Sequence, residues 1–226
     1  MNDNVKVDVW ADVMCPWCYI GKRRLEEAAA VFSAGGPGEG RHLDIEFHSF
    51  ELASDIAIGH TQSVLDYNVN EKGMDEGDAT ALLARITTRA RAIGLDLHFE
   101  SALLTNTSLA HQLIHYAAAH GKQLEAEEAL FVAYFTQGRN VSDIEELGSI
   151  AQELGLDRDD AVRALEADEF LDAVHADEAA ARAYGIDSVP FFVIDGKYAV
   201  EGVQSTALIA SALETAWAER STAALA

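Results

Sequence analysis

Two cysteines three residues apart are the residues of this chain with the clearest chemical potential. Cys15 and Cys18 flank Pro16 and Trp17, and the 226 residues contain no other cysteine. A bridge between them would close too small a loop to act as a useful structural staple. In a reducing cytosol such a pair indicates redox chemistry, in which two thiols and a disulfide interconvert, or one half of a metal site.

A strand must deliver this pair to the start of a helix. Residues 5–10 alternate apolar and other side chains, which is the period of a strand. Apolar residues then recur at helical spacing from Leu25 to Phe32, before a glycine and proline run at 35–38 ends the pattern. Unpaired N–H groups at a helix start stabilise a thiolate, so we expect Cys15 to be the exposed nucleophile. Cys18 lies one turn further in, where its sulfur can attack a mixed disulfide at Cys15.

The residues between the cysteines suit the docking of another protein's cystine. Pro16 lacks an N–H that would need a partner in the first helical turn, and its backbone angle is preset. Trp17 adds a large apolar surface beside the sulfur.

The metal interpretation is weaker. His111 and His115 stand four residues apart on one predicted helix, but the glutamate of the zinc-protease motif is missing between them. The chain also has no second cysteine pair to complete a zinc site. We therefore predict no metal and no cofactor.

The remaining elements predict an α/β fold with an insertion. A strand within 42–52 completes a strand–helix–strand unit, for which parallel pairing is the default. Residues 61–184 show helix after helix, whereas strands at 188–194 and 197–200 flank Asp195-Gly196, a dipeptide suited to a tight hairpin turn. An amphipathic helix follows from Ile209. We expect one domain built from 1–55 and 185–226, and an all-helical inserted domain at 56–184.

Composition excludes several classes of partner. The chain has 16 Lys and Arg against 38 Asp and Glu, a formal net charge of -22. Nucleic acid and anionic lipid would repel most of this surface. The sequence starts without a basic segment followed by an apolar run, and no stretch of twenty apolar residues occurs later. We expect a soluble cytoplasmic protein that binds neither nucleic acid nor membrane.

Three groups of residues, in the right order, resemble the FrnE-like branch of the DsbA family. They are DVMCPWCYIG at 12–21, Asn106-Thr107 with Ala110-His111, and Val-Pro-Phe-Phe at 189–192. The resemblance implies a thioredoxin fold interrupted by the helical domain. It also implies dithiol–disulfide oxidoreductase activity, with protein or small-molecule thiols and disulfides as partners.

The resemblance assigns further residues to the site. A cis Pro190 would face the cysteines and turn the backbone of Val189 toward the site, where its N–H and C=O pair with an extended substrate strand. Periplasmic relatives carry a buried acid six residues before the nucleophile, and this chain has Val9 there. Asp12 is the substitute candidate for that proton acceptor.

Asn106 and His111 belong to the same family pattern. We expect them to support the cleft between the two domains. The alternative is a capping asparagine and a satisfied core histidine.

Two other functions stay open. Glutathione-dependent isomerases of the 2-hydroxychromene-2-carboxylate isomerase type resemble this architecture, although they place a serine where Cys15 stands. A non-catalytic peptide-binding or chaperone-like module could use Trp17 and Pro190 without turnover.

Two charged features are assigned no chemistry. The basic run at 22–24 is interpreted as a solvated helix face, and the acidic pairs, including the one at 177–178, as helix starts, where negative charge is favoured.

Overall fold

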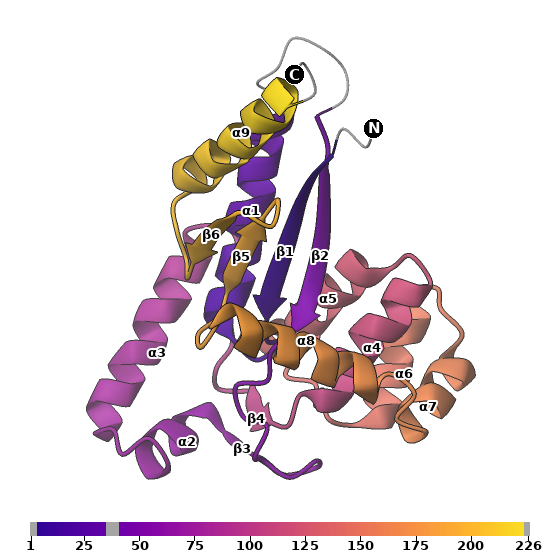
Figure 1. Ribbon diagram of the computed structural model, residues 1–226. Coiled ribbons are helices and arrows are strands. Elements are labelled where there is room, and N and C mark those ends of the chain that lie inside the picture. Colours follow the sequence, from indigo (N-terminus) through magenta and orange to yellow (C-terminus); the bar gives the residue numbers. More distant parts are fainter. Residues whose placement is uncertain (1–3, 35–40, 224–226) are drawn as a thin grey trace.

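A four-stranded sheet forms the centre of the molecule (Figure 1). The computed structural model describes residues 4–34 and 41–223, with side chains described as far as residue 220. Strands β1 (Val5–Ala11) and β2 (Leu43–Ser49) are parallel, and β5 (Phe191–Ile194) and β6 (Tyr198–Glu201) continue the sheet in antiparallel pairing, in the order β2-β1-β5-β6. Each of these four strands overlaps a predicted segment, although β1 and β6 each run one residue further than predicted.

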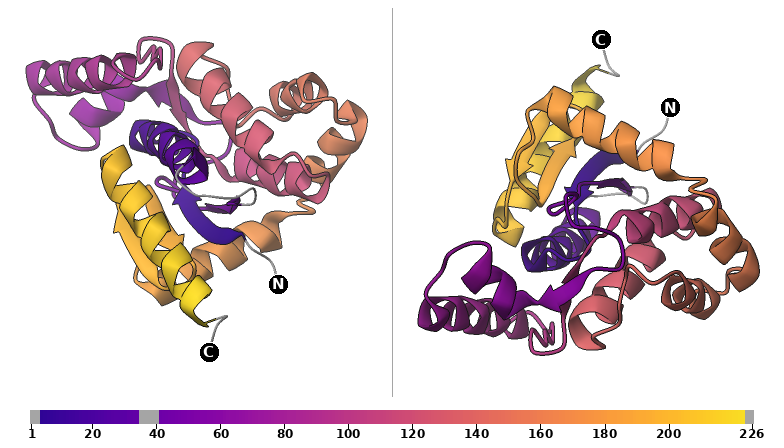
Figure 2. Two further views of the ribbon diagram at one scale, coloured as in Figure 1. Left: turned by 90° about the horizontal axis from the view of Figure 1, so that it is seen from above. Right: turned by 90° about the horizontal axis from the view of Figure 1, so that it is seen from below.

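Helices cover both faces of this sheet (Figure 2). Helix α1 (Pro16–Ala34) packs against α9 (Thr206–Ala223) on one face, and α8 (Leu171–Tyr184) lies against the other. Strand β1 shows why: Val7 and Val9 point into the main core, whereas Trp10 packs against Ala181 of α8. The glycine and proline run at 35–38 lies outside the described residues, and α1 ends just before it.

The insertion between β2 and β5 contains most of the helices. Besides α8, they are α2 (Val64–Asn70), α3 (Glu76–Arg91), α4 (Ser108–Ala119), α5 (Gln123–Phe131), the π-helix η1 (Val132–Thr136), α6 (Ile144–Glu153) and α7 (Arg158–Glu166). In Figure 1, α2 and α3 lie apart from the group formed by α4 to α7.

A short ladder corrects the expectation that the insertion is entirely helical. Strands β3 (Thr61–Ser63) and β4 (Leu103–Thr105) pair antiparallel within it. Three residues are too few to show the alternation by which a strand is recognised in a sequence. The exact domain boundaries stay a prediction.

Residues with a positive φ form the predicted hairpin turn and the end of α8. Asp195 and Gly196 adopt φ values of 56° and 66°, the left-handed pair that a two-residue hairpin requires. Gly185 ends α8 with φ 72°, and the N–H of Ile186 closes on the carbonyl of Ala181 at 2.9 Å. None of the helices in the described residues combines the length and apolar character needed to cross a membrane.

Candidate active site

The cysteine pair lies at the start of α1, directly after the turn that leaves β1. Pro16 is the first helical residue, and the N–H of Cys15 closes the turn on the carbonyl of Asp12 at 3.0 Å. Both cysteines are free thiols. The expectation of an exposed Cys15 is wrong: its exposed fraction is 4 %, against 1 % for Cys18. A position at a helix start does not by itself expose a side chain. Here the loop before β5 lies against the start of α1 and covers Cys15.

That loop contains the predicted cis proline. The Val189–Pro190 bond is cis, and the sulfur of Cys15 lies 3.8 Å from the carbonyl oxygen of Val189. Gly202 donates its N–H to the Pro190 carbonyl, whereas the N–H of Val189 makes no hydrogen bond within the described residues. Helix α1 approaches closely, because a Cβ placed on Gly21 would lie 2.8 Å from Pro190 Cγ. Glycine at this position lets the proline lie against the helix that carries both thiols.

Asp12 is fully buried beneath the pair. One carboxylate oxygen accepts from the N–H of Leu52 at 2.7 Å, and the other accepts from the N–H of Met14 at 3.3 Å. The second oxygen also lies 3.5 Å from Nε2 of His111. This separation is within ion-pair range, but Nε2 has no hydrogen bond of proper geometry with the described chain. Asp12 therefore holds the turn and also faces a buried histidine.

His111 and Glu127 bring further buried charge to this place. Burial lowers the pKa of His111, but Asp12, Glu127 and Glu51 outweigh it, so the pKa is raised. Burial raises the pKa of Glu127 to about 7, although His111 and Lys22 pull it down. The Glu127 carboxyl makes no hydrogen bond within the described residues, and its exposed fraction is 2 %. Charged groups left this incompletely paired are typical of functional sites.

The pKa values of two further groups, Cys18 and Tyr134, are raised in part by Cys15. Burial raises the pKa of Cys18, and the hydrogen bond and charge of Cys15 raise it further. Tyr134 belongs to η1, a π-helix of the kind that often occurs at functional sites. Burial raises its pKa, as do the charges of Asp12 and Cys15.

The two insertion residues of the family pattern take different positions. Asn106 accepts from the N–H of Ser108 at 2.9 Å and donates to the carbonyl of Ile56 at 2.9 Å. Asn106 thus closes a turn one residue before Thr107, the N-cap of α4, and ties the start of that helix to the loop after β2. His111 lies beside Asp12 without a hydrogen bond at Nε2, so it differs from a satisfied core histidine.

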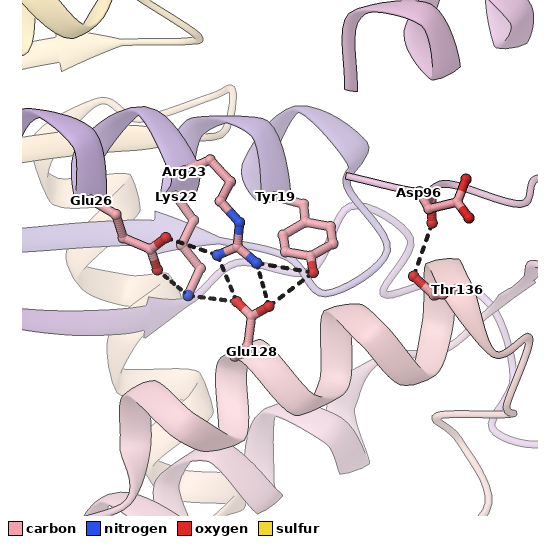
Figure 3. Close-up of polar contacts among 7 residues, drawn as sticks. All are labelled: Tyr19, Lys22, Arg23, Glu26, Asp96, Glu128 and Thr136. Atoms are coloured by element: carbon pink, nitrogen blue, oxygen red, sulfur yellow. Dashed lines mark hydrogen bonds and ion pairs between the residues drawn. The ribbon is translucent and has the colours of Figure 1, made fainter. Parts of the chain in front are cut away.

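The basic run after the motif forms a charged cluster instead of a solvated face (Figure 3). Lys22 is only 6 % exposed and lies 2.7 Å from Glu128 of α5 and 2.5 Å from Glu26. Arg23 also pairs with Glu128, which accepts from the hydroxyl of Tyr19 at 2.9 Å. Burial raises the pKa of Glu128, but these donors outweigh it and lower the pKa to about 2. The cluster joins the helix of the cysteines to the insertion.

A second polar cluster lies on the opposite face of the sheet. Asp177 occupies the middle of α8, so its assignment to a helix start is wrong. Its carboxylate lies 2.8 Å from Nδ1 of His48 and 3.0 Å from Nε2 of His115, and Nε2 of His48 lies 2.9 Å from Asp8. Burial lowers the pKa of His48, but Asp177 and Asp8 outweigh it and raise the pKa to about 9.

One group of side chains in the described chain has the composition of a cation site. Ligand atoms of Asp8, Glu46 and His48 lie within 4.8 Å of one another. The ammonium of Lys6 already lies 2.9 Å from each of the two carboxylates. Since Lys6 and a protonated His48 supply positive charge there, the group is explained without a metal.

Glu127 shows what sequence analysis missed and which signal was present. Its position places it on the same helical face as the buried Leu130 and Phe131. A glutamate on an apolar face is an exception that can be noticed in the sequence. No comparable signal exists for Tyr134, because a π-helix has no simple periodicity in the sequence.

Known proteins with similar sequences and structures share this architecture. The model of the DSBA-like thioredoxin domain matches residues 6–214. The chain belongs to this DsbA-like family. It is similar to a probable DsbA oxidoreductase from Streptomyces coelicolor, with a TM-score of 0.87 and 34 % identity over 96 % of this chain and 91 % of that one. The predicted thioredoxin-like fold with a helical insertion is therefore confirmed.

Two further similarities cover most of the DsbA-like chain. The uncharacterized protein YwbO of Bacillus subtilis is 29 % identical over 194 residues, 84 % of this chain and 86 % of that protein. A 2-hydroxychromene-2-carboxylate isomerase has a TM-score of 0.69 at 18 % identity, over 98 % of this chain and 99 % of that one. This second likeness concerns the fold alone. Family membership and the Cys15–Cys18 pair together place the chain among the DsbA-like oxidoreductases.

Proposed function

We propose that this chain is a thiol–disulfide oxidoreductase of the FrnE-like branch, acting in the cytoplasm on protein or small-molecule thiols and disulfides. Cys15 forms a mixed disulfide with the substrate, and Cys18 resolves it. The observation that carries the proposal is the pair of free thiols at the start of α1, with the carbonyl of Val189 3.8 Å from the Cys15 sulfur beside cis Pro190.

In the first step, the Cys15 thiolate attacks one sulfur of the substrate disulfide. The substrate S–S bond breaks, and the departing sulfur leaves as a thiolate that takes up a proton. Helix-start N–H groups favour the anionic nucleophile. The Val189 N–H, unpaired within the described residues, offers a hydrogen-bond donor to an extended substrate backbone.

In the second step, Cys18 loses its proton and attacks the Cys15 sulfur. The bond between Cys15 and the substrate breaks, and the second substrate thiolate is released. The substrate has gained two electrons and the cysteine pair has lost them. A thiol reductant restores the dithiol, and the reverse sequence would oxidise a substrate dithiol.

The order of these steps agrees with the environment of Cys18. Its pKa is raised by burial and then by Cys15. Once Cys15 is bonded to the substrate it carries no negative charge, so the deprotonation of Cys18 becomes easier. Asp12, buried next to the pair and backed by His111, is the proposed proton acceptor.

Reduction of insulin by a thiol reductant tests the proposal. Wild type should accelerate the reduction over many turnovers, and Cys15→Ser should fall to the uncatalysed rate while keeping its circular dichroism spectrum. Wild-type turnover retained in Cys15→Ser would overturn the proposal. Absence of turnover in both proteins would favour a peptide-binding module, and glutathione-dependent isomerisation without thiol exchange would favour the isomerase.

A further inference from the structure

A groove opens beside the residue that separates the two cysteines. Its volume is about 570 Å³, and it lies between α1, α3 and the loop that leads into α9, where Figure 1 shows the end of α3 close to β6. The residues that matter for its chemistry are Trp17, Ile20, Arg24, Arg89, Gln204 and Thr206.

Two arginines line this groove, and they differ in their partners. Arg24 lies 2.8 Å from Glu27, whose carboxylate also accepts from the hydroxyl of Thr206. Arg89 is exposed, and its guanidinium carbon lies 5.6 Å from the centre of the Trp17 ring. Within the described residues Arg89 has no carboxylate partner. It therefore presents an uncompensated charge beside an aromatic face.

An unpaired arginine is unusual in this molecule. Acidic side chains outnumber basic ones by 38 to 16. Among the described residues, every other Lys and Arg lies within ion-pair distance of a carboxylate, except for Lys72 and Arg85. The three exceptions all belong to α3 or to the loop before it, and Arg89 is the one that lines the groove.

We propose that this groove binds a carboxylate carried by the disulfide substrate, with Arg89 as its ion-pair partner. The inference rests on the proposed function and names a substrate class for it. A guanidinium offers two parallel N–H donors to a carboxylate, and the guanidinium of Arg89 lies over the face of the Trp17 ring. Gln204 and Thr206 also line the groove, where the Gln204 amide donates to the carbonyl of Glu201 at 2.8 Å and the Thr206 hydroxyl donates to Glu27.

The position of the groove limits where the carboxylate can be on the substrate. Trp17 lies two residues after Cys15, and the guanidinium carbon of Arg89 lies 5.6 Å from the centre of the Trp17 ring. An extended peptide spans about 10 Å in three residues, which covers the step from Cys15 past Trp17 to Arg89. The carboxylate therefore lies within about three residues of the substrate cysteine, or on a small acidic disulfide.

The net charge of -22 repels an acidic substrate, whereas Arg89 attracts its carboxylate. The relative size of this repulsion and this attraction decides whether the substrate binds. Charges spread over the surface are screened over about 8 Å at physiological salt. A contact between Arg89 and a carboxylate acts at hydrogen-bond distance and is screened much less. The local attraction decides binding once the substrate is in the groove.

Steady-state kinetics with matched disulfides tests the proposal. The substrates are peptide disulfides that differ only in having Glu, Gln or Lys two residues from the cysteine, together with glutathione disulfide and its ethyl ester. We expect wild type to prefer the Glu peptide over the Gln peptide by about fivefold in kcat/KM, as one partly exposed ion pair would give. Arg89→Gln should remove the preference by raising KM with kcat unchanged, and Arg89→Lys should keep part of it.

Arg91→Gln is the matched control. It removes the same charge from the same helix, but Arg91 pairs with Asp96 at 3.9 Å and does not line the groove. This variant should keep the preference for the Glu peptide. A preference confined to glutathione disulfide over its ester would identify a small acidic disulfide as the ligand, and one confined to the peptides would identify an acidic peptide.

Two results would overturn this inference. One is equal kcat/KM for the Glu, Gln and Lys peptides in wild type together with equal kcat/KM for glutathione disulfide and its ethyl ester, and the other is an unchanged preference in Arg89→Gln. Either result leaves the proposed function intact, because the disulfides are still turned over. Failure of the proposed function looks different, since no disulfide would then be reduced by any variant.

Discussion

Glu127 is a buried carboxyl group whose neighbours are other charges. His111 and Lys22 attract its ionised form, whereas Asp12 and the desolvation of the site oppose it. A buried carboxyl group that has to ionise reduces the stability of the folded state. Such a cost is tolerated where the charge is used, which fits its place near the proton acceptor proposed for Cys18.

We predict that Glu127→Gln makes stability less dependent on pH. The pKa rises from 4.5 in the unfolded chain to about 7 in the folded protein. Below pH 4.5 both states hold the proton; as pH rises toward 7 only the unfolded state loses it, so the folded state loses stability. The loss amounts to about 3 kcal/mol above pH 7 and should be absent in Glu127→Gln.

Urea unfolding at pH 5 and pH 8 measures this difference. Glu125→Gln is the control, because Glu125 is exposed on the same helix and pairs with Lys122 at 3.2 Å. The control should follow the wild-type pH dependence. An equal change in the free energy of unfolding at both pH values for Glu127→Gln would contradict the prediction.

At the level of single residues, the sequence was informative where the chemistry is local. Cys15, Cys18 and the cis Pro190 could be named because their spacing and family pattern carry the signal. The burial of Cys15 could not, since it depends on a loop more than 170 residues away. The pairing of Asp12 with His111 likewise depends on how the insertion packs.

Helix α8 is attached to the sheet by a histidine that holds a proton between two carboxylates. His48 of β2 contacts Asp177 of α8 and Asp8 of β1, and its ring stacks on Trp10 at 4.5 Å. The pKa of about 9 means that the ring is charged at neutral pH. This cluster couples the last helix of the insertion to the strand that precedes the cysteines.

We predict that wild type loses stability between pH 6.5 and 9.5, and that His48→Gln does not. The folded-state pKa exceeds the unfolded value of 6.5, so the stabilisation is fully present below pH 6.5 and is lost as pH rises through 9. The loss is up to about 3 kcal/mol. Chemical denaturation at the two pH values measures it.

His98→Gln is the comparison for this helix attachment. His98 also lies between two carboxylates, those of Asp96 and Glu100 at 3.0 Å each, but it is exposed to solvent. Water screens that cluster, so the variant should behave as wild type. A His48→Gln protein with the full wild-type loss would show that the cluster does not hold its proton.

The sequence predicted the helices and strands in which the hydrophobic pattern repeats over enough residues to be recognised. Strand β1 and helices α1 and α4 each repeat a pattern over several residues. The β3–β4 ladder and the π-helix η1 are too short or too irregular to show one. The basic run at 22–24 was misread, because only the packing of α5 shows that Glu128 meets it.

At the scale of the whole molecule, the insertion supplies part of the site. Helix α4 carries His111, α5 carries Glu127, and η1 carries Tyr134, and all three side chains are buried. The sheet and α1 supply the cysteines and the proline loop. Removal of the insertion would therefore remove three groups that interact electrostatically with the buried Asp12.

Trapping of the mixed disulfide tests the central claim most directly. Cys15→Ser and Cys18→Ser proteins are each mixed with a peptide disulfide, quenched with acid and weighed by intact-protein mass spectrometry. We predict that Cys18→Ser accumulates one covalently attached peptide, which a reductant removes, because Cys15 attacks and nothing resolves the bond. Cys15→Ser should stay unmodified. The reverse pattern, or no adduct on either variant, would contradict the assignment of Cys15 as nucleophile and Cys18 as resolving thiol.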